Sequence, residues 1–263
     1  MKFAAGLLRK SWPRDERVLH ESRLFTLMRA YALRILCLFF LLCARFSAGS
    51  GSIGTVHMMS NPANHRFLAL GDSYTIGESV DENDRWPVQL ARLLRAEGIS
   101  MEDPVIIAKT GWTTDELAKA IDEQDPRGPF DLVSLLIGVN NQYRGRSADE
   151  YRDEFRALLT RAIGFAGGEA KHVVVLSIPD WGVTPFAEGR DRNRIAREID
   201  LFNAINVQET ARAGCHYLDI TPESRTAHVE KSLVASDGLH PSEKMYADWA
   251  RRIVPKVLPF LKP

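Results

Sequence analysis

The chain has 263 residues, 45% of them hydrophobic, which is enough to bury the core of one domain of roughly 200 residues. Its 34 basic and 34 acidic residues balance, but the first 57 residues hold nine basic and three acidic ones, which leaves 25 and 31 for the remainder. This mildly acidic body has no basic stripe, which argues against a nucleic-acid partner. Only one of the three cysteines lies in the body, and no Cys/His cluster has zinc-ligand spacing, so the sequence predicts no metal site.

An apolar run near the N-terminus predicts an export signal. The uncharged segment Ile35–Ala44 follows Arg29 and Arg34. As a helix it would span about 15 Å, too short for a hydrocarbon core of about 30 Å. Small residues at 48–50 permit cleavage after Ser50, so the order of charge, apolar core and cleavage site favours a secreted or periplasmic protein whose mature form has no membrane span.

The start of translation leaves alternatives open. Met28 would be a compact start for such a signal, which makes residues 1–27 a candidate mis-assigned extension. A start at Met58 or Met59 would give a cytoplasmic protein, and a disordered or interfacial tail is a further alternative. We therefore divide the chain into an N-terminal extension, 1–57, and a domain, 58–263.

Short apolar runs alternate with longer amphipathic segments through the domain. Predicted strands span 66–70, 104–108, 132–137, 173–178 and 215–220, and predicted helices span 85–97, 113–123, 147–166, 191–213 and 242–261. Five strand–helix units predict a parallel sheet with helices on both faces. The expected fold class is therefore α/β, a three-layer α/β/α flavodoxin-like fold with a five-stranded parallel sheet.

Four segments with unusual residues follow predicted strands or precede the last helix. They are Gly71–Ser73, Lys109–Trp112, Gly138–Asn141 and Asp237–Pro241. Because parallel strands end at the same edge of a sheet, we expect functional residues to gather there.

Ser73, Asp237 and His240 fit a nucleophilic site. Serine is a weak nucleophile unless a base takes its proton, and the base needs a third group that fixes its tautomer. Asp237 and His240 are three residues apart, so one turn can bring the carboxylate against the imidazole and leave the other ring nitrogen for Ser73. Each residue alone is more typical of a turn or cap, but their combination in this order favours catalysis.

A developing oxyanion also needs hydrogen-bond donors. Gly111 can offer a backbone N–H, Asn140 a side-chain amide, and Ser73 its own N–H. The residues around Ser73 do not form a G-x-S-x-G elbow, because the glycine after the serine is missing, and this disfavours the ordinary lipase fold.

Four blocks, GDSYTIGE, the glycine of KTGWT, GVNNQ and DGLHPS, resemble in order those of the SGNH (GDSL) hydrolases, which include lysophospholipase-like esterases. The resemblance runs from Phe67 to the C-terminus. It implies a flavodoxin-like sheet, no metal or other cofactor, and hydrolysis of esters or thioesters. It also implies that Ser73 is the nucleophile, that Asp237 and His240 complete the triad, and that Gly111 and Asn140 are oxyanion donors.

Two positions depart from the family pattern, and both bear on substrate rather than reaction type. Tyr74 stands where the first block often has leucine, and Asn141 where the third often has aspartate. We expect Asp72 to orient its own loop through side-chain hydrogen bonds. We expect Asn141, Trp112 and Trp181 to support or line a substrate pocket, or, for the tryptophans, to seal the core.

The leading hypothesis is a serine esterase that forms an acyl-serine intermediate with a small-molecule ester or thioester. Acyl transfer to an alcohol or sugar would use the same residues. A non-catalytic flavodoxin-like binding module is a third alternative, although neither G-x-G-x-x-G nor a phosphate-binding loop follows a predicted strand. The loop 179–191 is the longest candidate for a lid or specificity segment. The sequence leaves acyl chain length and oligomeric state open.

Overall fold

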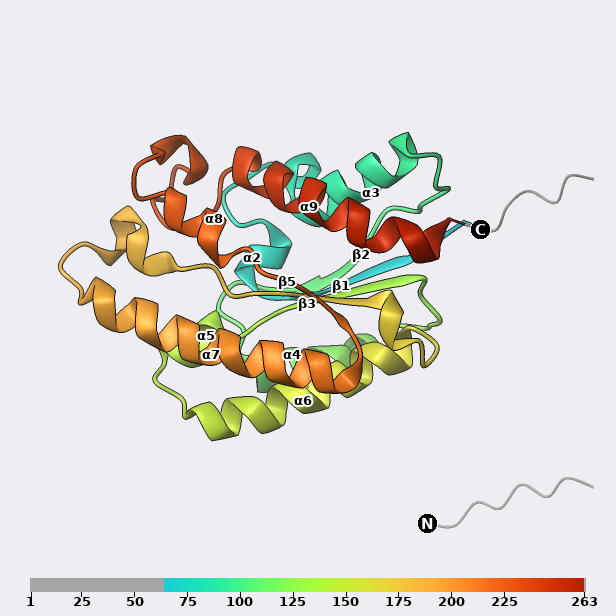
Figure 1. Cartoon of the computed structure of the whole chain (residues 1–263), viewed down its shortest axis with the longest axis horizontal. Helices are drawn as coiled ribbons and strands as arrows, with labels where there is room; N and C mark the ends of the chain where they lie inside the picture. Colours follow the sequence, from blue (N-terminus) through green and yellow to red (C-terminus); the bar gives the residue numbers. More distant parts are fainter. Residues whose placement is uncertain (1–63, 263) are drawn as a thin grey trace, which may run out of the picture. The chain divides into compact units, whose positions relative to one another are not determined.

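The computed structural model describes residues 64–262, which fold around a central sheet (Figure 1). The predicted export signal, the alternative starts at Met28, Met58 and Met59, and the predicted boundary after residue 57 lie outside the described residues and stay predictions. Among the helices of residues 64–262, none is both long and apolar enough to cross a membrane.

The sheet is entirely parallel. Its strands are β1 (Phe67–Gly71), β2 (Val105–Ala108), β3 (Leu132–Leu136), β4 (Val173–Leu176) and β5 (His216–Leu218), in the order β2-β1-β3-β4-β5. Because the strand order reverses at β1, the carboxyl ends of β1 and its neighbours form the crevice in which α/β folds place their sites. The predicted α/β fold with a five-stranded parallel sheet is confirmed.

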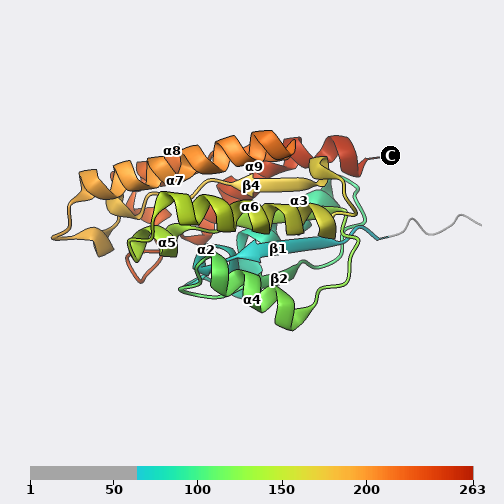
Figure 2. The same ribbon diagram turned by 90° about the horizontal axis from the view of Figure 1, so that it is seen from below.

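Helices cover both faces of the sheet and give three layers (Figures 1 and 2). α3 and α9 pack together on one face, whereas α4, α6 and α7 cover the other. The helices are α2 (Ser73–Ile76), α3 (Trp86–Ala96), α4 (Thr114–Gln124), α5 (Val139–Tyr143), α6 (Ala148–Phe165), α7 (Arg192–Ala213), α8 (Thr221–Thr226) and α9 (Glu243–Leu261). Short 3-10 turns lie at Glu82–Asp84, Ala170–His172, Trp181–Val183, Pro185–Ala187 and Lys231–Leu233.

The core lies between these layers. Every residue of β1, β3 and β4 is buried, as expected for inner strands of a parallel sheet. Trp86 of α3 and Trp249 of α9 are fully buried on one face, where the Trp86 ring centroid lies 6.3 Å from that of Phe67. The strands therefore end at a fixed edge, on which short loops can hold side chains in place.

Three short helices, α2, α5 and α8, do not appear among the predicted elements. A helix of four to six residues is too short to show an apolar face in the sequence. As a result, Ser73 and Asn140, which we expected in loops, lie at the first position of α2 and within α5.

A buried carboxylate joins α6 to α7. Glu209 of α7 is 1% exposed and pairs with Arg152 of α6 at 2.7 Å, Arg156 of α6 at 3.0 Å and Arg212 of α7 at 3.3 Å. The hydrogen bonds and charge of Arg156 and its neighbours outweigh the opposing effect of burial and lower the pKa of Glu209 from 4.5 to about 2.

We predict that Glu209→Gln lowers the free energy of unfolding at pH 7 by about 1–3 kcal/mol. The carboxylate contributes fully above the unfolded pKa of 4.5, and its contribution is lost as the pH falls through about 2. Urea unfolding should therefore show a difference from wild type that shrinks by roughly half by pH 3. Glu123→Gln, at an exposed pair with Lys119, serves as the control with little effect. An equal destabilisation at pH 7 and pH 3 would contradict this account.

Candidate active site

Ser73 is the first residue of α2, which begins two residues after the end of β1. Gly71 ends the strand, and any side chain there would collide with the Thr75 hydroxyl, so the chain turns on a glycine. Asp72 is the N-cap of α2, and its Oδ1 accepts the Tyr74 N–H at 3.1 Å. Because Ser73 is the first helical residue, its own N–H has no intrahelical acceptor.

Asp72 lies beneath this turn. It is fully buried, and Oδ2 has no hydrogen-bond partner within residues 64–262. Burial raises the pKa of Asp72 from 3.8 to about 7, although the hydrogen bond from the Tyr74 amide opposes the rise. The hydrogen bond from Tyr74 N–H fixes the start of α2, where Ser73 lies.

One turn before α9 holds Asp237 against His240. Asp237 Oδ1 accepts the backbone N–H groups of Leu239 at 2.9 Å and His240 at 3.0 Å, and Oδ2 lies 2.5 Å from His240 Nδ1. The His240 side chain is nearly buried, and the Tyr74 ring packs edge-on against it with centroids 5.7 Å apart. Because Nδ1 faces the carboxylate, Nε2 is the ring nitrogen left for other partners.

Asp237 is held in its ionised form. Partial burial would raise its pKa, but hydrogen bonds from His240, from the Leu239 and His240 amides and from Ser79 outweigh that effect and lower the pKa of Asp237 from 3.8 to about 2. The carboxylate is thus charged at neutral pH and can stabilise a positive charge on the adjacent imidazole.

Sequence reasoning missed Ser79. Its hydroxyl donates to Asp237 Oδ2 at 2.8 Å, the same oxygen that faces His240. The backbone of Ser79 has a φ of 66°, which is uncommon for a residue other than glycine. No sequence signal separates Ser79 from other exposed serines, because the contact joins positions far apart in the chain.

A cavity of about 180 Å³ brings the predicted groups together. Its walls come from the ends of β1, β2 and β3, from the loop after β4 and from the turn before α9, and they comprise Ser73, Tyr74, Thr110, Gly111, Val139, Asn140, Tyr143, Trp181, Phe186, Leu239 and His240. Ser73 and His240 share the cavity, although no hydrogen bond joins them in the described part of the chain. Such contacts are often long in unliganded enzymes and tighten when substrate binds.

Three residues on the cavity wall have an N–H donor without an acceptor among the described residues. Within residues 64–262, neither the Ser73 nor the Gly111 backbone N–H donates to a protein acceptor. Gly111 has a φ of 86°, and a side chain there would meet only Arg144 Nη2, at 3.8 Å, so glycine serves the backbone conformation. Asn140 Nδ2 donates one hydrogen to the Trp112 carbonyl at 2.9 Å, which orients the amide and leaves its second hydrogen available.

The side chains of the other predicted pocket residues, Trp181, Asn141 and Trp112, differ in whether they line the cavity. Trp181 lines the cavity, and its indole N–H donates to Gln142 at 2.8 Å. Asn141 does not line the cavity, because its side chain is buried in hydrogen bonds with Thr114, accepting from its N–H at 3.1 Å and donating to its hydroxyl at 2.6 Å. Trp112 contributes its carbonyl to Asn140, while its half-buried ring packs on the core.

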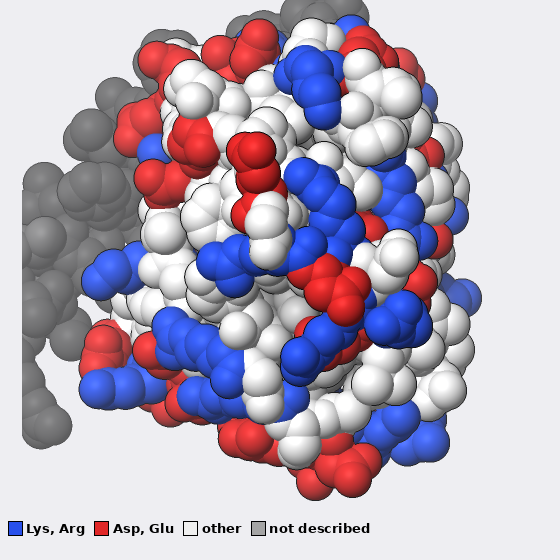
Figure 3. Space-filling view, turned by 90° about the vertical axis from the view of Figure 1, so that its left-hand side faces the viewer, with Lys and Arg blue, Asp and Glu red and all other residues white. Residues whose placement is uncertain are grey.

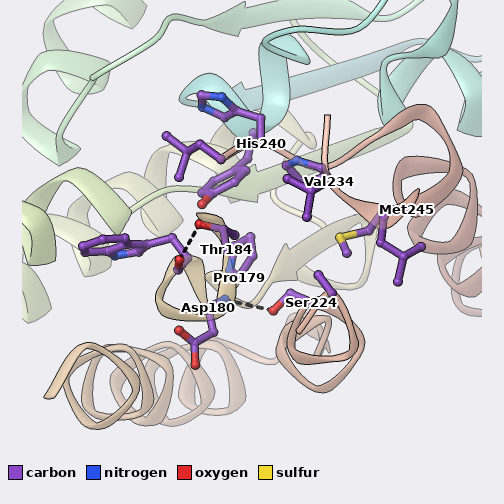
Figure 4. A pocket seen from close by; sticks show the side chains of 13 residues that line it. Pro179, Asp180, Thr184, Ser224, Val234, His240 and Met245 are labelled. Carbon is purple, nitrogen blue, oxygen red and sulfur yellow. Dashed lines mark hydrogen bonds between the residues drawn. The ribbon is translucent and has the colours of Figure 1, made fainter. Parts of the chain in front are cut away.

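A smaller cavity of about 10 Å³ lies behind His240 (Figure 4). There the Asp180 N–H donates to Ser224 Oγ at 2.9 Å, and the Thr184 hydroxyl donates to the Trp181 carbonyl at 2.7 Å. The bond to Ser224 attaches the loop after β4 to α8, and the bond from Thr184 closes a turn within that loop beside Trp181. Among the described residues, no group of three or more His, Cys, Asp or Glu side chains is placed to hold a metal ion.

A parallel α/β sheet that presents a serine, a histidine–aspartate pair and amide donors at its carboxyl edge is typical of hydrolases that act on acyl groups. The sequence profile of the GDSL-like lipase/acylhydrolase family matches residues 69–247, and the chain belongs to that family. It is accordingly a hydrolase of ester bonds. No curated protein matches the chain in sequence.

Solved structures share the fold. The psychrotrophic esterase EstA from Pseudoalteromonas sp., in a structure inhibited by monoethylphosphonate, aligns with a TM-score of 0.59 and 16% identity over 76% of this chain and 100% of its own. The lipase/acylhydrolase from Enterococcus faecalis aligns with a TM-score of 0.57 and 20% identity, over 76% of this chain and 98% of its own. The acetylxylan esterase Axe2 from Geobacillus stearothermophilus aligns with a TM-score of 0.57 and 21% identity, over 74% of this chain and 94% of its own.

We predict that Ser79→Gly raises the pKa of Asp237 by up to about one unit, because the ionised carboxylate loses a donor while glycine accepts the positive φ. Carboxyl-carbon NMR should show protonation of Asp237 beginning at a higher pH. Ser79→Ala should shift the pKa equally but lower the free energy of unfolding by about 1 kcal/mol relative to Ser79→Gly. An unchanged titration of Asp237 in Ser79→Gly would contradict the assigned role of this hydroxyl.

Proposed function

We propose that the protein is a serine esterase that cleaves carboxylic esters or thioesters through an acyl-Ser73 intermediate. One observation carries the proposal: Ser73, Gly111, Asn140 and His240 come from distant parts of the chain and line one cavity. Asp237 holds His240 from outside that cavity through a 2.5 Å contact with Nδ1.

The proposed reaction begins with attack of Ser73 Oγ on the ester carbonyl carbon. His240 Nε2 takes the hydroxyl proton, and Asp237, charged at neutral pH, stabilises the imidazolium. The tetrahedral intermediate then expels the alcohol or thiol, which receives the proton from His240. Water attacks the acyl-serine in the second half with His240 again as base, and Ser73 is restored. Acyl transfer to an alcohol or sugar would differ only in the acceptor.

The proposed oxyanion site consists of the Ser73 and Gly111 backbone N–H groups and the free amide hydrogen of Asn140. All three residues face the cavity, and each donor is typically worth about 2.7–4 kcal/mol of transition-state stabilisation. The cavity volume of about 180 Å³ is below the roughly 300–1,000 Å³ of most ligand sites, which favours a short acyl group.

We predict that a fluorophosphonate labels Ser73 and that Ser73→Ala and His240→Ala both abolish labelling. Hydrolysis of acetyl, butyryl and octanoyl nitrophenyl esters should lose at least about 10³-fold in kcat in both variants, with the shortest chains preferred in wild type. Ser100→Ala, at an exposed serine hydrogen-bonded to Asn64, is the matched control and should retain full activity. Intact labelling or turnover in Ser73→Ala would overturn the nucleophile assignment.

For Asn140→Ala we expect a fall in kcat of about 10²–10³-fold with KM nearly unchanged, because the lost donor acts on charge that develops only in the transition state. Steady-state kinetics on the acetyl ester measure both constants. Asn83→Ala removes an exposed asparagine that does not line the cavity and should leave both unchanged. A decrease of less than about threefold in Asn140→Ala would remove Asn140 from the oxyanion site.

A further inference from the structure

Three aromatic rings, here called the aromatic triangle, stand at the rim of the catalytic cavity. The ring centroids of Tyr143 and Trp181 are 5.5 Å apart, those of Trp181 and Phe186 6.0 Å, and those of Tyr143 and Phe186 6.4 Å. All three side chains line the cavity that holds Ser73 and His240. Trp181 is buried, whereas Tyr143 is 46% and Phe186 42% exposed, so the rim presents apolar surface to an incoming molecule.

Arg190 caps the aromatic triangle. Its guanidinium carbon lies 5.3 Å from the Tyr143 centroid, 5.4 Å from that of Trp181 and 5.3 Å from that of Phe186, all within the range of cation–π attraction. Nη2 also donates to the Tyr143 hydroxyl at 3.2 Å. The rings therefore hold a positive charge at the edge of the cavity.

No carboxylate pairs with Arg190 within residues 64–262, and one of its five N–H donors, on Nη2, has a hydrogen-bond acceptor there. Arg190 shares a neighbouring cavity of about 240 Å³ with Asp191 and Glu198. Both carboxylates are engaged: Asp191 accepts the Arg194 N–H at 2.9 Å as the N-cap of α7, and Glu198 binds Arg194 Nε at 2.7 Å and Gln142 at 2.7 Å.

Other arginines near the rim have acceptors in the protein. Arg144 pairs with Glu116 at 3.2 Å and donates to the Gly111 carbonyl at 2.6 Å, and Arg192 donates to the Gly182 carbonyl. Figure 3, viewed from the side on which β1 ends, shows basic side chains gathered among uncharged ones, with acidic side chains interspersed. Arg190 differs from both arginines in lying over three aromatic rings that line the catalytic cavity.

We propose that Arg190 binds an anionic group of the substrate, so that the preferred substrates are esters that carry an oxyanion such as a carboxylate. The reacting carbonyl would lie at Ser73, and the intervening part of the molecule would cross the aromatic triangle. A guanidinium already oriented by three rings loses little freedom when it binds an oxyanion through its remaining donors. This assignment rests on the proposed esterase function and specifies its substrate class.

Two matched ester pairs test the proposal and distinguish the side of the ester that carries the anion. para-Nitrophenyl hydrogen adipate and para-nitrophenyl hexanoate differ by a carboxylate on the acyl side. para-Acetoxybenzoate and its methyl ester differ by a carboxylate on the alcohol side. The kcat/KM of all four is measured for wild type, Arg190→Gln, Arg190→Lys and the remote control Arg92→Gln, an exposed arginine on α3.

We expect wild type to prefer the anionic member of one pair by about tenfold or more, and increasing salt to reduce that preference. Arg190→Gln should abolish the preference while changing the neutral ester by less than about twofold, Arg190→Lys should restore part of it, and Arg92→Gln should match wild type. Equal losses on neutral and anionic esters in Arg190→Gln, or no preference in wild type, would overturn the assignment of Arg190. Absence of hydrolysis of all four esters together with absence of phosphonate labelling would instead contradict the esterase function on which it rests.

Discussion

The common direction of the five strands is the constraint on which the site depends. Because β1, β2 and β3 are adjacent and parallel, the segments that follow them bring Ser73, Gly111 and Asn140 to one edge of the sheet. His240 reaches the same edge because α9, packed beside α3, starts just after the turn that holds it. An antiparallel pairing of β1 with either neighbour would send one of these segments to the opposite edge.

Two carboxylates near the serine have pKa values shifted in opposite directions, and their surroundings explain why. Asp72 is buried with one oxygen unpartnered, which raises its pKa to about 7. Asp237 receives four hydrogen bonds on its two oxygens, which lowers its pKa to about 2 despite partial burial. Asp237 can therefore support a charged imidazole at neutral pH, whereas Asp72 suits the orientation of its own turn.

The sequence predicts the strands, the long helices and the sheet direction because these depend on apolar periodicity, which is local. The contact between Asp237 and His240 is also predictable, since three residues and one turn separate them. Ser79 and the cap formed by Arg190 are not, because each depends on the distance between segments far apart in the chain. Asn141 and Trp112 illustrate the converse: both adjoin cavity residues in sequence, yet the hydrogen bonds of Asn141 with Thr114 and the packing of Trp112 on the core direct their side chains elsewhere.

The proposed reaction requires groups from four separate segments to act on one reacting carbonyl. A crystal structure of the phosphonate adduct tests it most directly, because the tetrahedral phosphorus stands in for the acyl carbon of the intermediate. We expect phosphorus bonded to Ser73 Oγ, with the phosphonyl oxygen about 2.7–3.1 Å from the backbone nitrogens of Ser73 and Gly111 and from Asn140 Nδ2. His240 Nε2 should face Oγ. A phosphonyl oxygen directed away from Gly111 and Asn140, or an adduct on another residue, would contradict it.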